Sequence, residues 1–271
     1  MIVDQNLLLV GCGKMGGALL SGWLDRDLAA EDVLVVEPFG GDALQNQFGV
    51  SVVEKLEGVP QSYSPDIVVF AVKPQAMDEI VPLYARFVDK GPMFLSIAAG
   101  KPSSYFLNCL GENAAIVRSM PNTPAAVGRG ITVAYGSDAV SKEQKSVATT
   151  LLEAVGEVGW VENEALIDGV TAVSGSGPAY VFLLIECLAQ AGIEVGLDPD
   201  LAARLALATV AGSGELARQS TESASTLREN VTSPGGTTAA ALEILMADDG
   251  LQNLMSRAVA AAETRSRELA S

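Results

Sequence analysis

The chain has 271 residues, 49% of them hydrophobic, which is enough for one large domain or two of ordinary size. Its net charge of -16 argues against a nucleic-acid partner, because phosphate binding needs clustered Lys and Arg, and only 17 are present. The sequence contains no histidine, which excludes proton transfer by histidine and histidine-ligated metals. No dense Asp, Glu and Cys cluster replaces it, so we expect no metal site.

The cysteines and the hydropathy pattern indicate a cytoplasmic protein. Cys12, Cys109 and Cys187 are odd in number and widely spaced, which fits neither a disulfide framework nor a zinc cluster. No apolar run approaches the roughly 18 to 20 residues that cross a bilayer, and no basic segment opens the chain. We therefore expect reduced cysteines and no membrane partner.

The N-terminal segment predicts a dinucleotide-binding loop. The apolar run 7–10 is followed by Gly11-Cys12-Gly13-Lys14-Met15-Gly16 and a helical stretch over 17–24. In a G-x-G-x-x-G loop the first glycine permits the tight turn, the second admits the pyrophosphate, and the third lets helix and strand pack. The strand, loop and helix context makes this pattern more specific than the glycines alone.

Glu37 ends the next predicted strand, 33–36, and lies 21 residues past Gly16. An acid at this distance can accept hydrogen bonds from the adenosine ribose, and it repels a 2′-phosphate. Residues 38–41 offer no Arg or Lys to hold that phosphate. We therefore expect NADH to be used at least as well as NADPH, although a solvated acid at a strand end would look the same.

Strand-helix alternation continues to about residue 163. The expected strands are 66–72, 93–97, 115–117, 131–134 and 157–161, with a helix over 141–155 that has Ser141 as its N-cap and Gln144 placed for a capping box. This alternation predicts an α/β, doubly wound sheet whose ligand lies at the carboxyl ends of the strands. Small residues and prolines follow three of these strands, at 72–74, 97–100 and 120–124.

From residue 164 onward only helical spacing remains. The expected helices are 165–174, 178–195, 200–218, 223–230, 238–247 and 250–269, with Asp198-Pro199 as a start signal and a sharp break at Ser174-Gly175-Ser176-Gly177-Pro178. The stretch 179–191 is apolar nearly all round, more than a domain of this size buries alone. We expect a homodimer built through this half, or a helix packed on the first domain.

The segment 232–238, Thr-Ser-Pro-Gly-Gly-Thr-Thr, begins a helix with free backbone N-H groups. Such a helix start binds anions, carboxylates included. As an isolated pattern it is more typical of a loop and N-cap between packed helices.

Taken together, these residues make the chain resemble the pyrroline-5-carboxylate reductase family over essentially its full length. The matching blocks are 11–16, 71–74, 96–100, 118–125, 173–182 and 231–242, and the last two are the most specific to that family. The resemblance implies a Rossmann-like domain, residues 1–163, and an all-α C-terminal dimerisation domain, residues 164–271. It also implies reduction of L-1-pyrroline-5-carboxylate to L-proline with NADPH or NADH, and dimers that assemble into decamers.

The resemblance assigns the site residue by residue. It places the substrate carboxylate on Ser233, Gly235, Gly236, Thr237 and Thr238, with Thr238 bonded to the ring nitrogen as the catalytic residue. The cofactor set combines the glycine loop and Glu37 with the strand ends: Gly11, Gly13, Lys14, Met15, Gly16, Glu37, Ala71, Val72, Lys73, Pro74, Ala98, Ala99, Met120, Pro121 and Asn122.

Two departures concern the cofactor. Glu37 and Gly40-Gly41 replace the small hydroxyl residues of NADPH-using relatives, and residues 54–64 lack the asparagine that many relatives have there. Two other functions remain as alternatives. A 3-hydroxyacid dehydrogenase would need a catalytic lysine in the second half, which contains none, and a non-catalytic NAD-sensing protein would not need the anion-binding loop.

Overall fold

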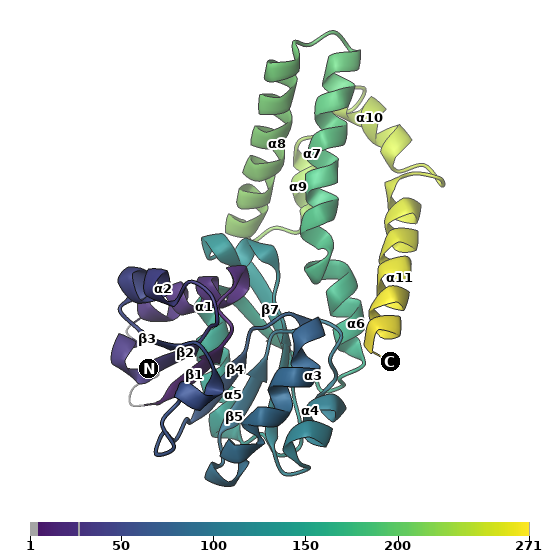
Figure 1. The fold of residues 1–271 in the computed structure, drawn as a ribbon. Helices are drawn as coiled ribbons and strands as arrows, with labels where there is room; N and C mark the ends of the chain where they lie inside the picture. Colours follow the sequence, from purple (N-terminus) through teal and green to yellow (C-terminus); the bar gives the residue numbers. More distant parts are fainter. Residues whose placement is uncertain (1–4, 27, 271) are drawn as a thin grey trace. The chain divides into compact units, whose positions relative to one another are not determined.

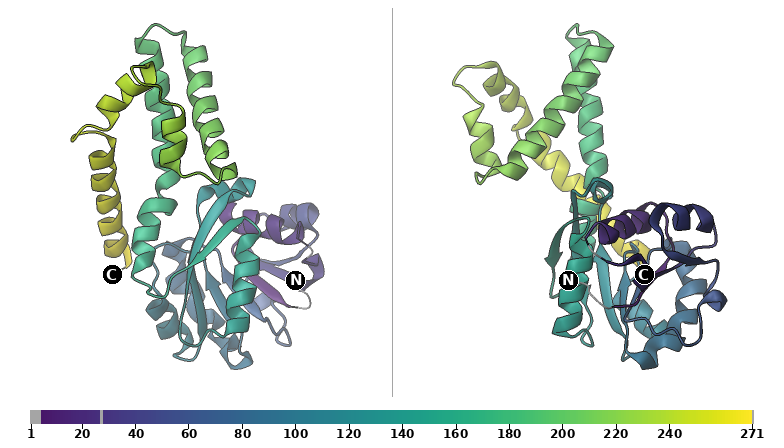
Figure 2. Two further views of the ribbon diagram at one scale, coloured as in Figure 1. Left: turned by 180° about the vertical axis from the view of Figure 1, so that it is seen from behind. Right: turned by 90° about the vertical axis from the view of Figure 1, so that its left-hand side faces the viewer.

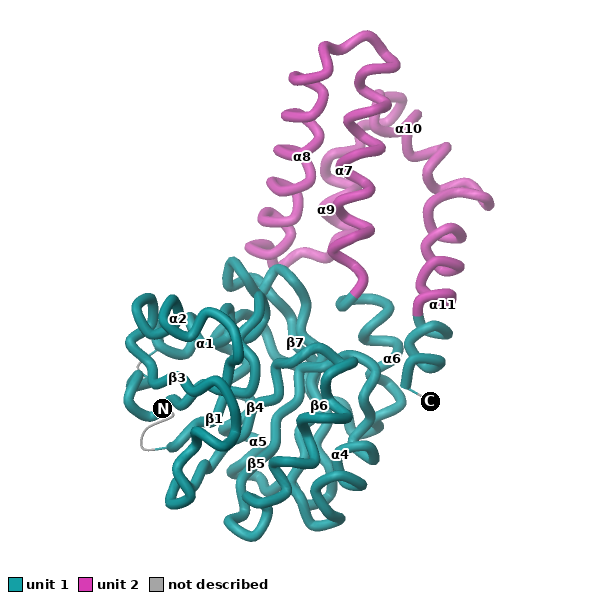
Figure 3. The backbone as a smooth tube through the Cα atoms, in the orientation of Figure 1, with its two compact units in different colours: residues 1–175, 263–271 teal, residues 176–262 magenta. Residues whose placement is uncertain are grey.

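The computed structural model describes residues 5–26 and 28–270. It divides into two compact units, Met1–Gly175 together with Glu263–Ser271, and Ser176–Ala262 (Figure 3). The first unit contains the whole sheet and the second is helical.

The first unit is built on one eight-stranded sheet. Its strands are β1 (Leu7–Val10), β2 (Val33–Val36), β3 (Ser51–Val53), β4 (Ile67–Phe70), β5 (Met93–Ser96), β6 (Ala115–Met120), β7 (Gly130–Gly136) and β8 (Gly156–Trp160). The order is β3-β2-β1-β4-β5-β6-β7-β8, and only the β6–β7 pair is antiparallel. The first six strands have the doubly wound order of dinucleotide-binding sheets, so the predicted fold class is confirmed. Strand β3 was not predicted, because only three residues form it and none is fully buried.

Helices cover both faces of this sheet, as opposite views in Figure 1 and the left part of Figure 2 show. Leu7 and Leu9 of β1 pack with α1 (Lys14–Leu24) and α5 (Lys142–Glu153) on one face. Leu8 and Val10 point to the other face, toward α3 (Met77–Ile80) and α4 (Ser103–Leu110). The helix α2 (Gly41–Phe48) follows β2. The 3₁₀ segments are Ala30–Asp32, Leu56–Gly58, Pro74–Ala76, Val81–Lys90 and Thr123–Val127.

The capping box predicted for α5 is confirmed. The backbone N-H of Gln144 donates to Ser141 Oγ at 3.1 Å, and the N-H of Ser141 donates to Gln144 Oε1 at 3.0 Å. Each side chain satisfies a donor that the start of the helix leaves free, so this local pattern fixes the helix start.

The C-terminal half contains α6 (Leu166–Val170), a π-helical turn (Thr171–Gly175), α7 (Gly177–Glu194), α8 (Pro199–Gln219), α9 (Ala224–Asn230), α10 (Thr237–Leu245) and α11 (Leu251–Ala270). Every predicted helix is present within a few residues of its expected ends. Asp198 caps α8, as predicted, by accepting from the N-H groups of Asp200 and Leu201 at 3.0 and 3.3 Å. In the second unit α7 and α8 pack side by side as a helical hairpin (Figure 1).

The sharp break predicted at 174–177 is wrong. The backbone stays helical there because a π-helical turn joins α6 to α7. The hydroxyls of Thr171 and Ser174 donate to the carbonyls of Ile167 and Val170 at 2.8 and 3.0 Å, which gives partners to carbonyls in the widened turn. Pro178 lies in the first turn of α7, where a proline removes no helical hydrogen bond.

This continuity corrects the expectation that no long apolar run exists. Residues Leu166–Glu194 form 29 helical residues with a mean hydropathy of 1.5 in their most apolar window, of which 6% is buried. By length and composition alone this helix could cross a membrane. One such helix is weak evidence that a protein spans a membrane, because a core helix of a soluble protein can pass the same test. On α7, Val181, Phe182, Leu183 and Leu184 are 45 to 59% exposed in the single chain. An exposed apolar surface of this kind indicates a site that is buried by a protein partner or a membrane.

Candidate active site

The glycine loop has the geometry that the sequence predicts. Gly11 has φ +85°, and a Cβ there would stand 2.6 Å from Val72 Cγ1, so only glycine fits between β1 and β4. A Cβ on Gly16 would stand 2.7 Å from the Gly11 carbonyl oxygen, which explains the close packing of α1 on the loop. Within the described residues, nothing lies within 4 Å of a Cβ built on Gly13, which leaves the backbone open to a pyrophosphate.

The start of α1 leaves anion-binding donors free. The first hydrogen bond of this helix runs from the Gly17 N-H to the Gly13 carbonyl at 2.8 Å, and no side chain among the described residues caps the helix. The N-H groups of Lys14, Met15 and Gly16 therefore remain for a ligand. These donors and the open glycine fit a nicotinamide dinucleotide at this edge of the sheet.

Glu37 lies against the glycine loop rather than in free solvent. Its carboxylate accepts from the N-H of Cys12 at 2.7 Å and from the N-H of Phe39 at 3.1 Å. Burial, and secondarily the Glu37 charge, raise the pKa of the Cys12 thiol to about 11. The Cys12 thiol is therefore protonated at neutral pH. The two backbone N-H groups hold the Glu37 carboxylate at the end of β2.

An apolar pocket of about 280 Å³ is lined by the two neighbours of Glu37 in the chain, Val36 and Pro38. It is lined by Val10, Val36, Pro38, Glu54, Lys55, Leu56, Glu57, Val72, Ile80, Leu83 and Tyr84. Lys55 is exposed and makes no ion pair with another described residue. The predicted cofactor set omits Lys55 because it follows β3, the strand that the sequence pattern did not reveal.

The predicted strand-end residues gather at the carboxyl edge of the sheet. Ala71–Pro74 follow β4, Ala98 and Ala99 follow β5, and Met120–Asn122 end β6. The Asn122 side chain is fixed from two sides: its Nδ2 donates to the Ser174 carbonyl at 3.2 Å, and its Oδ1 accepts from the Ile131 N-H at 2.9 Å. The π-helical turn that carries Ser174 therefore holds the loop after β6 in place.

The predicted substrate loop belongs to the second unit. Gly235 has φ +68°, which favours glycine, and a Cβ on Gly236 would stand 2.4 Å from Ser233 Oγ and 3.1 Å from the Ser233 carbonyl oxygen. The N-H of Gly236 donates to the Ser233 carbonyl at 3.0 Å, and the first helical bond of α10 runs from Ala240 to Gly236 at 3.2 Å. Within this fully described loop, the N-H groups of Thr237, Thr238 and Ala239 and the Thr238 hydroxyl have no hydrogen-bond partner. All predicted cofactor residues lie in the first unit and all predicted substrate residues in the second.

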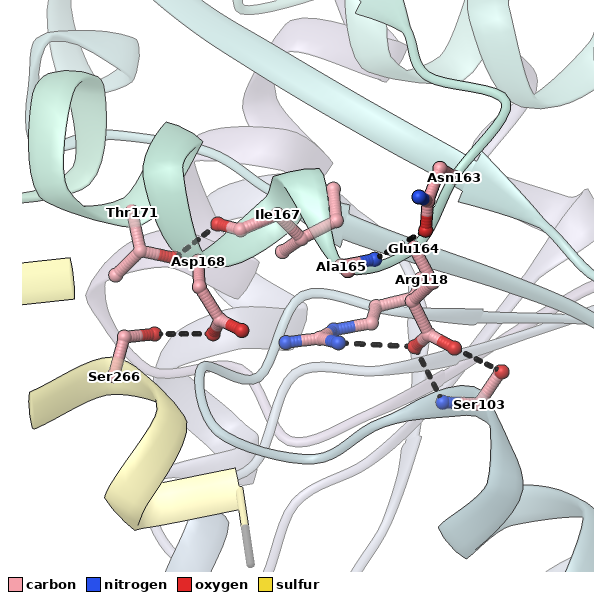
Figure 4. Close-up of polar contacts among 9 residues, drawn as sticks. All are labelled: Ser103, Arg118, Asn163, Glu164, Ala165, Ile167, Asp168, Thr171 and Ser266. Atoms are coloured by element: carbon pink, nitrogen blue, oxygen red, sulfur yellow. Dashed lines mark hydrogen bonds and ion pairs between the residues drawn. The ribbon is translucent and has the colours of Figure 1, made fainter. Parts of the chain in front are cut away.

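Glu164 is a further polar centre that the sequence patterns did not single out. Its carboxylate accepts from the Ser103 N-H at 2.7 Å, from the Ser103 hydroxyl, and from Arg118 at 2.9 Å (Figure 4). Arg118 is only 4% exposed. The partners are 61 and 46 residues away along the chain, so no local spacing could reveal the cluster.

The doubly wound sheet, the open glycine loop and the capless start of α1 define a nicotinamide dinucleotide-dependent oxidoreductase with a helical second unit. Comparison with known proteins gives the particular family. Residues 164–269 match the model of the pyrroline-5-carboxylate reductase dimerisation family, and residues 6–100 match that of the NADP oxidoreductase, coenzyme F420-dependent family.

Individual relatives match along the whole chain. Pyrroline-5-carboxylate reductase from Pseudomonas aeruginosa is 39% identical over 268 residues, which cover 98% of this chain and 97% of that protein. The structure of the reductase from Coxiella burnetii has a TM-score of 0.92 at 32% identity and covers 98% and 99% of the two chains. The Plasmodium falciparum reductase with NADP bound has a TM-score of 0.83 at 29% identity and covers 99% of each chain.

The chain belongs to the pyrroline-5-carboxylate reductase family. Its reaction is the reduction of L-1-pyrroline-5-carboxylate to L-proline by a nicotinamide dinucleotide, as the resemblance implied. The matched dimerisation region, residues 164–269, contains α6 to α11 and therefore includes the exposed apolar surface of α7. The homodimer expected from the sequence is therefore supported, and the packing of α7 on the first domain is not needed to explain its composition.

Proposed function

We propose that the loop 233–238 binds the carboxylate of pyrroline-5-carboxylate and that Thr238 contacts the ring nitrogen. The observation that carries this proposal is the start of α10, where the N-H groups of Thr237, Thr238 and Ala239 and the Thr238 hydroxyl are all free. Backbone donors at a helix start are suited to a carboxylate. Steady-state oxidation of NADH with pyrroline-5-carboxylate and with 1-pyrroline, which lacks the carboxylate, tests the assignment.

The roles of the residues follow from the chemistry of an imine. A protonated imine already carries its proton and an electrophilic carbon, so its reduction needs little acid catalysis, and a chain without histidine can perform it. The bound cofactor supplies the hydride. The loop 233–238 orients the ring through its carboxylate, and the Thr238 hydroxyl positions or donates to the nitrogen as it becomes an amine.

We assign cofactor binding to the domain 1–163 and substrate binding and dimerisation to the domain 164–271. In the first domain the glycine loop holds the pyrophosphate, while Ala71–Pro74, Ala98, Ala99 and Met120–Asn122 line the nicotinamide side. The assignment is supported by the position of these segments at the carboxyl ends of β1, β4, β5 and β6. Decamers assembled from the dimers and a cytoplasmic location complete the proposal.

For the cofactor we propose that NADH is used at least as well as NADPH. The Plasmodium falciparum relative binds NADP, and the matched family model carries NADP in its name. Here, however, hydrogen bonds from Cys12 and Phe39 fix the Glu37 carboxylate at the end of β2, where it repels a 2′-phosphate. Lys55 is the one cation among the described lining residues of the pocket, which also include Glu54 and Glu57, so the local charge still disfavours that phosphate.

Replacing Glu37 with serine is expected to raise the ratio of kcat/KM for NADPH to that for NADH by about tenfold, because one repelled charge is worth about 1.4 kcal/mol at a partly exposed site. The two values of kcat/KM are measured in parallel. Lys55→Gln is the matched control, and the same ratio should fall in it. A large preference of the wild-type protein for NADPH would contradict the proposal.

A further inference from the structure

We propose that Glu164 is a positioning residue for the reaction: its carboxylate holds together two segments that line the cofactor. The inference rests on the proposed placement of the cofactor along the loops after β5 and β6. Glu164 itself lies between β8 and α6, outside every predicted cofactor or substrate segment.

The donors to this carboxylate come from the two segments in question. Ser103 is the first residue of α4, three residues after Gly100, and it supplies both its N-H and its hydroxyl. Arg118 lies on β6, two residues before Met120, and pairs in register with Ser96 at the end of β5. One carboxylate therefore fixes the segment that follows Ala98 and Ala99 relative to the segment that precedes Met120.

Glu164 supplies a hydrogen-bond acceptor for the start of α4 and a counterion for Arg118. The N-cap position of α4 is Pro102, whose side chain makes no capping bond, so the first N-H of this helix depends on Glu164. The guanidinium of Arg118 is buried, with a side-chain exposure of 5%, and its ion pair is with Glu164 at 2.9 Å. A buried guanidinium without its counterion is strongly disfavoured.

Asp168 is an alternative ion-pair partner for Arg118 when Glu164 is replaced. Figure 4 shows the guanidinium lying between the carboxylates of Glu164 and Asp168, with its hydrogen bond to Glu164 drawn as a dashed line. Asp168 accepts from the Ser266 hydroxyl at 2.7 Å, which holds it on the far side of Arg118. Removing the charge of Glu164 would draw Arg118 toward Asp168 and loosen the end of β6 from α4.

The test is the Kd of NADH and of NADPH for Glu164→Gln, measured by fluorescence titration without substrate. We expect both Kd values to rise about tenfold, the KM for the cofactor to rise with them, and the KM for pyrroline-5-carboxylate to stay within twofold. Glu162→Gln is the matched control, because Glu162 is 92% exposed and its ion pair is with Lys145 at 3.4 Å. It should bind both cofactors like the wild-type protein.

Ser103→Ala keeps the Arg118–Glu164 ion pair and removes only the hydrogen bond from the Ser103 hydroxyl to Glu164. It therefore tests the positioning role of Glu164 if Glu164→Gln does not fold. We expect its Kd values to rise about threefold at an unchanged Tm. Wild-type Kd values in Glu164→Gln, or in Ser103→Ala where the first variant does not fold, would overturn the inference. So would an equal rise in both KM values. If the wild-type protein binds the cofactor but does not turn over pyrroline-5-carboxylate, the proposed function fails instead.

Discussion

Replacing Thr238 with alanine is expected to lower kcat by about 10- to 1000-fold, the range for one lost donor or acid-base contact. The Thr238 hydroxyl lies in the first turn of α10 and has no hydrogen-bond partner within its described surroundings, so its removal breaks no bond of the fold. The loss should therefore be in catalysis rather than in stability. Steady-state kinetics at saturating NADH and pyrroline-5-carboxylate measure it.

Thr238→Ser is the matched control because it keeps the hydroxyl and removes only the methyl group. It should retain kcat within about threefold. Wild-type kcat in Thr238→Ala would remove Thr238 from catalysis and leave the backbone N-H groups as the whole contribution of the loop.

The second large effect is expected at the exposed surface of α7. Phe182 and Leu184 are 59% and 49% exposed in the single chain, and α7 has no buried residue. Burying one such side chain contributes about 1.5 to 3 kcal/mol, and burying a charge in its place is unfavourable. The double variant Phe182→Glu, Leu184→Glu should therefore raise the dissociation constant of the dimer by at least about 100-fold, as measured by sedimentation equilibrium.

Phe39→Glu is the control for this experiment. Phe39 is 80% exposed but lies outside the dimerisation region 164–269, so the same change there should leave the dimer intact. If the double variant on α7 remains dimeric at wild-type concentrations, this apolar surface is not the dimer interface. The apolar surface of α7 would then have to be buried by something other than a second copy of the chain; its composition also fits a membrane-crossing helix.

The sequence predicts those parts of the fold that local patterns encode. The apolar runs of β1, β2 and β4 are buried on both faces, and the capping residues Ser141 and Asp198 mark helix starts. Strand β3 lacks this signal because Ser51 is exposed and the two valines are only half-buried. The glycines and proline at 174–178 were misleading, because a π-helical turn accommodates them without ending the helix.

The same distinction holds for the candidate site. The open glycine loop and the free start of α10 are properties of short segments, so they could be predicted residue by residue. The carboxylate of Glu164 meets Ser103 and Arg118 only through the fold, and Lys55 reaches the pocket beside Val36 and Val72 through the unpredicted β3. Contacts between distant segments require the structure.

The most direct test of the central claim compares pyrroline-5-carboxylate with 1-pyrroline, following NADH oxidation at 340 nm. If the N-H groups at the start of α10 bind the carboxylate, losing two charged hydrogen bonds of about 1.5 kcal/mol each should lower kcat/KM by at least about 100-fold for 1-pyrroline. The account predicts rapid oxidation with pyrroline-5-carboxylate and this large loss with 1-pyrroline. Equal values of kcat/KM for the two imines would contradict it.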